Sequence, residues 1–362
     1  MNIKDLFANQ SITAEEFLQR YWQKQPFLFR NTSLDFSSLP NPVQLFKLAS
    51  EEDVQSRIIY SEDSKGYQAI YDDPDAWEDV SNFNPTLLVS DIEKWRPETM
   101  AILDAFPFIK SWRLDDLMIS FAPTGASVGA HTDHYDVFLI QTSGTRQWSY
   151  DDKPLKKTEL VKASDLSILN NYQAKTTVEL KTGDVLYLPP EIPHHGISTS
   201  EDCMTCSIGM RAPSQSEMVM AFAEFIANRC DETNRFTDQG RMDSIYSFDN
   251  NDIEKFKQTI LSAFGIKNDD WGQLFGQFFS EYRQLETLIE TQPEHIGLWQ
   301  KNPMVTFLYQ ISGDTCKLFI DGETFECAAS FAQMICHQQT FERQNNEVFE
   351  KLVEAGYLQP VT

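Results

Sequence analysis

The histidines of this sequence gather where they could bind a metal. Four of the six form two tight pairs, His131 with His134 and His194 with His195. In GAHTDHYDVFLIQ, His131 and Asp133 are two positions apart, so their side chains point the same way on a strand or at a strand end. In LYLPPEIPHHGIS, turn-forming prolines precede His194, where the chain would enter another strand. Two histidines and one carboxylate on one face of a metal leave three adjacent positions open, as non-haem iron(II) oxygenases require.

This ligand set alone leaves three interpretations open. The chain could be an oxygenase that uses a 2-oxo acid and oxygen. It could instead be another metal-dependent cupin, such as an isomerase or a zinc-type hydrolase, because zinc hydrolases use similar ligands. In the third interpretation the chain is a non-catalytic scaffold whose histidines are structural, since a bare His-x-Asp motif occurs by chance in many proteins.

The elements that must position these ligands are strands. Short alternating segments fill residues 115–213, namely DLMISFA, YDVFLIQ, TRQWSY, TTVELK, DVLYLP and MTCSIGM, which is typical of a β-barrel or sandwich. In the first segment, apolar residues at every second position alternate with Asp116, Met118 and Ser120. This mixed face could line a substrate cavity. It could equally face solvent, as one side of many antiparallel sheets does.

A cation follows on the next predicted hairpin. Arg146 lies fifteen residues after His131, on the strand that returns toward it. There a guanidinium could grip the far carboxylate of a dicarboxylate. The alternative is a surface arginine. Alternation places Arg146, Trp148 and Tyr150 on one face, and the two aromatic neighbours favour partial burial.

The segment before this region is predicted to be mixed in structure. A capping-box motif, TAEE, precedes residues at helical spacing, and PFLFR follows as a strand. Residues 30–110 are expected to form short helical and irregular pieces, with Trp77 and Trp95 as packing anchors and little chemistry.

The pattern turns helical after residue 212. The segments SEMVMAFAEFIANRC and WGQLFGQFFSEYRQLETLI predict helices, and the second carries a broad apolar stripe, made of Trp271, Leu274, Phe275, Phe278, Tyr282, Leu285 and Ile289. The stripe either belongs to a core or forms a dimer interface. We interpret residues 213–290 as a helical dimerisation region.

Residues 291–362 combine short strands and helices in an order compatible with a winged helix. This part holds four Lys/Arg and nine Asp/Glu, so we do not expect it to bind DNA. The whole chain has 362 residues, enough for two or three domains, and a net charge of −24. Such a charge repels nucleic acid and attracts basic partners, although solubility or a saline habitat could also explain it.

The first residues and the cysteines indicate in which cellular compartment the protein is expected. The first residues show no secretory signal and no run of membrane-spanning length follows, so a soluble, cytoplasmic protein is expected. Six scattered cysteines then favour free thiols. Cys203 and Cys206 have CxxC spacing, which could indicate zinc or redox chemistry. We favour two ordinary strand cysteines, because residues three apart on a strand face opposite ways and no second pair accompanies them.

The motifs together point to a family. The stretch DDLMISFAPTGASVGAHTDHYDVFLIQTSGTRQW, followed by GDVLYLPPEIPHHGIS and SIGMRAP, resembles the JmjC-type (cupin-4) ribosomal oxygenases of bacteria, in particular those that hydroxylate an arginine of the sixteenth large-subunit protein. FLQRYWQKQPFLFR resembles the family's opening segment, and the domain order agrees. The resemblance covers nearly the whole chain and is specific around the histidines, but it weakens beyond residue 215.

The resemblance implies a mainly β catalytic domain over residues 1–212. Its core, about residues 113–212, would be a double-stranded β-helix, the JmjC-cupin barrel, followed by α-helical and winged-helix parts in an α+β chain. The implied site has three groups: iron ligands His131, Asp133 and His194; 2-oxoglutarate contacts Arg146, Ser120, Thr205 and Ser207; and substrate contacts Asp116, Met118 and Tyr135. Thr205 and His195 stand where relatives carry other residue types, which leaves their roles open.

The implied reaction depends on iron(II) and consumes oxygen and 2-oxoglutarate. It releases succinate and carbon dioxide and places a hydroxyl on the β-carbon of an arginine. Its substrate would be a basic ribosomal protein of the large subunit, whose charge suits an acidic enzyme. Sister ribosomal oxygenases share the metal motif and hydroxylate histidine, so histidine remains the alternative target. Asp116 favours arginine. No membrane contact is expected, and the enzyme is expected to be a homodimer through residues 213–290.

Overall fold

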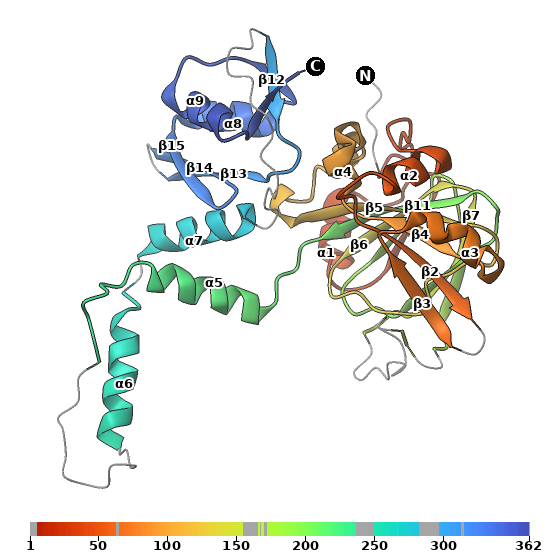
Figure 1. Cartoon of the computed structure of the whole chain (residues 1–362), viewed down its shortest axis with the longest axis horizontal. Helices are drawn as coiled ribbons and strands as arrows, with labels where there is room; N and C mark the ends of the chain where they lie inside the picture. The colour runs from red at the N-terminus through yellow and green to blue at the C-terminus, as the bar shows by residue number, and fades with distance from the viewer. Residues whose placement is uncertain are drawn as a thin grey trace. The chain divides into compact units, whose positions relative to one another are not determined.

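Two units divide the chain in the computed structural model, Met1–Ala212 and Pro213–Thr362 (Figure 1). The structure describes residues 6–62, 65–154, 166, 168–169, 172–236, 250–265, 267–281, 297–312 and 315–361. Across these residues, no helix is both long enough and apolar enough to span a bilayer.

The first unit is built on two antiparallel sheets. The large sheet has the order β1-β9-β6-β11-β5-β4-β2-β3, with the bounds β1 Phe27–Phe29, β2 Ser56–Glu62, β3 Gly66–Tyr71, β4 Thr86–Val89, β5 Leu114–Ala122, β6 Val137–Ser143, β9 Val185–Leu188 and β11 Cys203–Met210. The small sheet has the order β10-β7-β8, with the bounds β7 Thr145–Tyr150, β8 Thr176–Lys181 and β10 His194–Ser198. The six alternating segments and PFLFR all contain strands, as predicted.

The prediction for residues 30–110 was wrong in one respect, because β2, β3 and β4 lie there and extend the large sheet. All four residues of β4 are buried, and β2 buries Ile58 and Ile59 in succession. A strand covered on both faces loses the alternation by which strands are found in a sequence. Trp77 and Trp95 do pack against the core, as expected.

Each face of the large sheet covers a different core. On β6, Phe138 and Ile140 point to the core beneath the helices. Val137 and Leu139 point the other way and pack with Trp148 of the small sheet. The space between the two sheets is therefore apolar at one end, and side chains on the same inner face further along the sheet can line a cavity.

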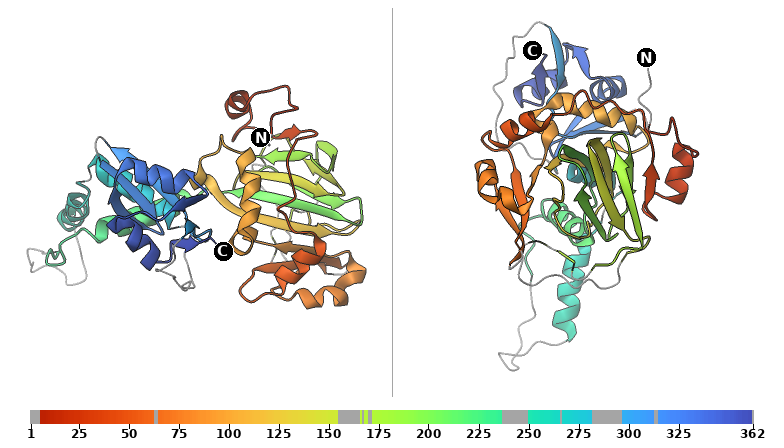
Figure 2. Two further views of the ribbon diagram at one scale, coloured as in Figure 1. Left: turned by 90° about the horizontal axis from the view of Figure 1, so that it is seen from above. Right: turned by 90° about the vertical axis from the view of Figure 1, so that its right-hand side faces the viewer.

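The helices of the first unit close the outer face of the large sheet. They are α1 Ala14–Arg20, α2 Pro42–Ala49, α3 Trp77–Val80 and α4 Ile92–Trp95, with 3-10 turns at Pro74–Ala76, Ser81–Phe83, Pro97–Ala105 and Ser111–Arg113. The predicted capping box at Thr13 and Glu16 is present and starts α1. Helix α1 lies beside the strands (Figure 2). Fully buried Phe17 holds it there, with its ring centroid 5.0 Å from that of Tyr187.

The second unit combines three helices with a small α+β core. Its helices are α5 Gln215–Ala227, α6 Asn250–Ser262, α7 Asn268–Ser280, α8 Ala329–His337 and α9 Glu347–Glu354. Its strands are β12 Leu298–Lys301, β13 Phe307–Ser312, β14 Thr315–Ile320, β15 Glu323–Cys327, β16 Thr340–Glu342 and β17 Leu358–Pro360, in two sheets ordered β16-β12-β17 and β13-β14-β15. The winged-helix assignment of this part stays a prediction.

Helix α7 packs closely on the sheet β13-β14-β15. A Cβ added to Gly276 would lie 2.4 Å from the Phe319 ring, so only glycine allows this approach. Along the predicted apolar stripe, Trp271 and Phe275 are exposed while Leu274 and Phe278 are partly buried. The stripe's last three members, Tyr282, Leu285 and Ile289, lie outside the described residues.

Candidate metal centre and active-site pocket

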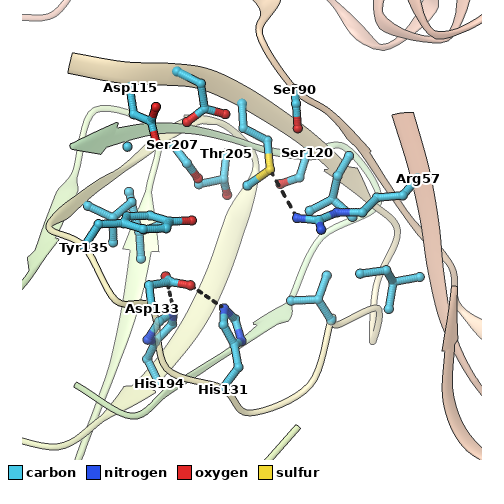
Figure 3. Close-up of a pocket in the computed structure, with 18 of the residues that line it drawn as sticks. Arg57, Ser90, Asp115, Ser120, His131, Asp133, Tyr135, His194, Thr205 and Ser207 are labelled. Atoms are coloured by element: carbon cyan, nitrogen blue, oxygen red, sulfur yellow. Dashed lines mark hydrogen bonds and ion pairs between the residues drawn. The ribbon is translucent and has the colours of Figure 1, made fainter. Parts of the chain in front are cut away.

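A pocket of about 490 Å³ opens between the two sheets of the first unit. Its walls come from the inner faces of β5, β11 and β7, from the start of β10, and from β2 and β4 (Figure 3). All ten residues expected from the sequence to form the site line this one pocket: Asp116, Met118, Ser120, His131, Asp133, Tyr135, Arg146, His194, Thr205 and Ser207.

Three of these residues meet at one point of the pocket. The Nε2 atoms of His131 and His194 lie 3.8 Å and 3.5 Å from the two carboxylate oxygens of Asp133. His131 and His194 also exchange backbone hydrogen bonds of 3.0 Å in an isolated bridge, which fixes their side chains next to each other. Among the described residues, this is the one group of three His, Cys, Asp or Glu whose ligand atoms could share a metal.

Hydrogen bonds orient both imidazoles for ligation. His131 Nδ1 donates to the Gly129 carbonyl at 3.0 Å, and His194 Nδ1 donates to the Ile192 carbonyl at 2.9 Å. A carbonyl oxygen can only accept, so Nδ1 carries the proton and the Nε2 lone pair points toward Asp133. Burial, followed by the neighbouring His131, lowers the pKa of His194 to about 4. That ring is neutral near neutral pH, as a metal ligand must be.

The second histidine of each sequence pair, His134 and His195, points away from the metal group. His134 is exposed and pairs with the Glu191 carboxylate, and this interaction raises the pKa of His134. His195 points to the opposite side of β10 from His194, where its Nε2 lies 2.8 Å from the Ser127 hydroxyl. Neither ring belongs to the metal group.

Arg146 brings an unsatisfied cation into the pocket. Its side chain is almost entirely buried, beside the face of Trp148 with Cζ 5.6 Å from the ring centroid. Its Nε and Nη2 have no hydrogen-bond partner. Leaving buried charged donors unpaired is costly, so the guanidinium fits an anionic ligand such as a carboxylate. The surface-arginine alternative is excluded by this burial.

The inner face of β5 forms another wall. Asp116, Met118 and Ser120 line the pocket, while the alternate residues Leu117 and Ile119 pack in the outer core. The alternation in the sequence therefore separates core from cavity, and the alternative of a solvent-facing side is wrong.

Neighbouring residues on β11 complete this wall. A Cβ at Gly209 would lie 2.6 Å from the Asp116 Oδ1, so a glycine there leaves room for the carboxylate. Ser207 and Thr205 lie opposite Met118 and Ser120 in the sheet, and the Thr205 hydroxyl donates to the Gln141 side-chain oxygen at 3.3 Å.

Tyr135 and Met118 both line the pocket, and Figure 3 shows the Tyr135 ring above the metal group. Burial raises the pKa of the Tyr135 hydroxyl, and the negative charges of Asp133 and Asp116 raise it further. Tyr135 is consequently an uncharged wall at any working pH. An aromatic ring and a thioether on opposite sides can hold an alkyl or guanidinium group between them.

Sequence reasoning missed Arg57 on β2. It lies in the pocket with its Nη2 3.7 Å from the Met118 sulfur, and its Nε has no hydrogen-bond partner (Figure 3). Arg57 reaches the pocket through strand pairing, since it lies opposite Leu88, which in turn lies opposite Ser120. No local motif carries that information. Gln55, Ser90 and Asp115 also line the pocket and were also missed.

Two cysteines with CxxC spacing lie on the strand β11. Cys203 and Cys206 are buried on β11, and all six cysteines are free. Burial raises the pKa of the Cys206 thiol, so it stays protonated. Two ordinary strand cysteines therefore account for the CxxC spacing.

Comparisons with known proteins agree with this site. A JmjC domain model matches residues 101–218. The ribosomal protein uL16 3-hydroxylase of Escherichia coli K12 is 32% identical over 282 residues, which cover 77% of this chain and 74% of the relative. This chain belongs to the family of JmjC-domain ribosomal oxygenases. The predicted family is confirmed.

Solved structures of the same family agree over nearly the whole chain. The X-ray structure of E. coli ycfD has a TM-score of 0.78 and 26% identity, and the match covers 96% of this chain and 98% of ycfD. A structure described as ycfD in complex with cobalt and 2-oxoglutarate has a TM-score of 0.77 at the same identity and coverage. The predicted JmjC-cupin catalytic domain within an α+β chain is confirmed as well.

Proposed function

We propose that this protein is an iron(II)- and 2-oxoglutarate-dependent hydroxylase that acts on an arginine of a large-subunit ribosomal protein. One observation carries the proposal: a group of two histidines and one aspartate shares a pocket with a buried guanidinium that has two unpaired nitrogens. The family supports it, because one relative is named a ribosomal protein uL16 3-hydroxylase and a ycfD structure is described with cobalt and 2-oxoglutarate.

In this proposal His131, Asp133 and His194 hold the iron. Their two imidazole nitrogens and single carboxylate match the donor set of non-haem iron(II) oxygenases, in which three adjacent positions remain for other ligands. Iron(II) and 2-oxoglutarate, when bound, supply the oxidising power that lets oxygen hydroxylate an unactivated C–H bond. The protein's own part is to place one carbon near the metal and to exclude water.

Arg146 is proposed to bind the C5 carboxylate of 2-oxoglutarate. A carboxylate would give the two unpaired nitrogens a bidentate partner inside an apolar surround that includes Trp148. Ser120, Thr205 and Ser207 are proposed as lesser contacts, because their hydroxyls lie in the same pocket. Competing metal-dependent cupins need no such buried cation.

Asp116, Met118 and Tyr135 are proposed to hold the target side chain. The Asp116 carboxylate would accept hydrogen bonds from a guanidinium, while Met118 and Tyr135 flank its stem. With the guanidinium anchored beside Asp116, the β-carbon can approach the metal. A histidine target, the alternative, is shorter and carries no fixed positive charge for Asp116, so arginine is favoured.

Charge supports a basic substrate protein. The net charge of −24 speeds encounter with a ribosomal protein of opposite sign, and salt should slow that encounter. A ribosomal substrate would place the enzyme in the cytoplasm. The acidic C-terminal part is still expected not to bind DNA.

The homodimer is part of the same proposal. Helices α5, α6 and α7 expose large apolar side chains, among them Val219, Met220, Phe256 and Leu261. Sedimentation velocity should give twice 41.7 kDa, and Phe256→Glu should shift the protein toward monomer. The control is Val43→Glu on α2, an equally apolar exposed position that should leave the dimer intact. A monomeric parent protein would contradict the interface.

The experiment that tests the function is succinate release in the presence of short peptides. Peptides of one basic sequence would carry arginine, histidine or lysine at the target position. We expect succinate above the peptide-free level with arginine alone, in a reaction that needs iron(II) and 2-oxoglutarate. Stimulation by the histidine peptide alone would establish the alternative target, and no succinate under any condition would contradict the oxygenase.

A further inference from the structure

His195 adjoins a metal ligand in sequence yet faces away from the metal. Its partner is the buried Ser127, whose hydroxyl lies 2.8 Å from His195 Nε2. The hydrogen bonds that continue from Ser127 suggest a role for His195.

Those bonds lead step by step to the first metal ligand. The Ser127 hydroxyl accepts a hydrogen bond of 3.0 Å from the Gly129 backbone N–H. The carbonyl of the same residue, Gly129, accepts the 3.0 Å bond from His131 Nδ1. A displacement of the Ser127 hydroxyl therefore moves Gly129, whose carbonyl fixes the tautomer and the ring plane of His131.

The Gly129 segment is held in a conformation that needs such support. Gly129 has φ +89°, in the left-handed region that other residues rarely adopt. An added Cβ would also lie 2.9 Å from Ile168 and 3.0 Å from Tyr67, so the segment has little room. Ser127 forms an isolated bridge with Ile197 of β10, the strand on which His195 lies. Strand and loop are thus tied together beside the metal group.

From this chain of contacts we propose that His195 is a positioning residue for the metal centre. It holds the Ser127 hydroxyl, which holds Gly129, which orients His131 for ligation. His194 and His195 then serve one centre from opposite faces of β10, the first as a ligand and the second as a brace. This inference rests on the proposed metal site.

The test is cobalt(II) titration of the full-length protein, followed by its visible absorption. His195→Phe keeps an aromatic ring but removes the nitrogen, and should weaken cobalt binding about tenfold, the lower end of the effect of losing a residue that orients a ligand. The cobalt spectrum should change with it. His195→Gln, whose amide can reach Ser127, should restore both affinity and spectrum. Ser127→Ala should repeat the loss.

Two controls separate positioning from general damage. His134→Gln removes the other neighbouring histidine, which is exposed and has no bond to the Gly129 segment, and should bind cobalt like the parent. Thermal unfolding without metal should be the same for His195→Phe and the parent.

The outcomes are distinct. Equal cobalt affinity in His195→Phe and the parent would overturn the inference while leaving the metal site intact. An equal loss of cobalt affinity in His134→Gln would also overturn it. So would a loss of cobalt affinity in His195→Phe that accompanies a lower unfolding temperature and that His195→Gln does not restore. A parent protein that binds no cobalt would instead contradict the metal site itself.

Discussion

Replacing Arg146 with methionine tests the proposed co-substrate site. The variant keeps the apolar stem beside Trp148 and removes the two unpaired nitrogens. Hydrogen bonds to charged groups contribute about 1.5–3 kcal/mol. At about 1.4 kcal/mol for each factor of ten, 2-oxoglutarate should bind roughly 10- to 140-fold more weakly. Cobalt affinity should stay unchanged, because Arg146 is not one of the metal group.

Two measurements check this prediction. Succinate release gives the KM for 2-oxoglutarate, and thermal or urea unfolding gives the stabilisation by the ligand. At a 2-oxoglutarate concentration 100 times the parent's Kd, the parent gains about 2.7 kcal/mol, whereas a variant that binds 100-fold more weakly gains only about 0.4 kcal/mol. Without ligand, Arg146→Met should be no less stable than the parent, because two nitrogens of the buried guanidinium lack hydrogen-bond partners there.

The matched control is Arg20→Met, at an exposed arginine at the end of α1. It should leave the KM for 2-oxoglutarate unchanged. If Arg146→Met also leaves that KM unchanged, another residue holds the C5 carboxylate and the argument from unpaired nitrogens is refuted.

Three further substitutions test the metal group, the substrate pocket and a buried ion pair. Asp133→Ala should abolish cobalt binding and succinate release, while Asp152→Ala, at an exposed ion pair, should preserve both; retained turnover would refute the ligand assignment. Asp116→Asn should raise the KM for an arginine peptide by about tenfold or more, because a charged hydrogen bond is lost, and should leave the KM for 2-oxoglutarate unchanged. An unchanged KM for the peptide would show that Asp116 does not bind the substrate. Asp136→Ala should lower the free energy of unfolding by about 3–5 kcal/mol, because buried Asp136 pairs with Arg113 at 2.8 Å and the substitution would leave the Arg113 charge without this partner. A decrease of less than about 1 kcal/mol in urea unfolding would contradict this.

Local patterns in the sequence were enough to find much of the site. The spacing of His131 and Asp133 and the prolines before His194 pointed to the three ligands. His194 begins β10 as expected, whereas His131 and Asp133 lie in the segment between β5 and β6, and an isolated bridge from His131 to His194 brings them together. Alternation along β5 identified the two faces correctly, because they differ in polarity, but only the structure shows that the mixed face lines the pocket and not the solvent. Arg146 was found because it shares a strand face with Trp148.

What the sequence did not predict depends on contacts between distant segments. Arg57 enters the pocket only because β2 joins the sheet through β4, a pairing that leaves no local trace. Strand β4 is buried along its whole length and β2 buries two consecutive residues, so neither shows a clean alternation. His195 and Ser127 are 68 residues apart in the sequence. The sequence of the histidine pair therefore could not show that His194 is the ligand and that His195 contacts Ser127 instead.

The most direct test of the central claim is mass spectrometry of the product. The iron(II)-reconstituted enzyme would be incubated with oxygen, 2-oxoglutarate and the basic large-subunit ribosomal protein, and the protein then digested and sequenced by fragmentation. We expect a mass increase of one oxygen atom on a single arginine, with succinate formed in equal amount. An unmodified ribosomal protein beside steady succinate release would contradict the substrate, and neither product would contradict the oxygenase.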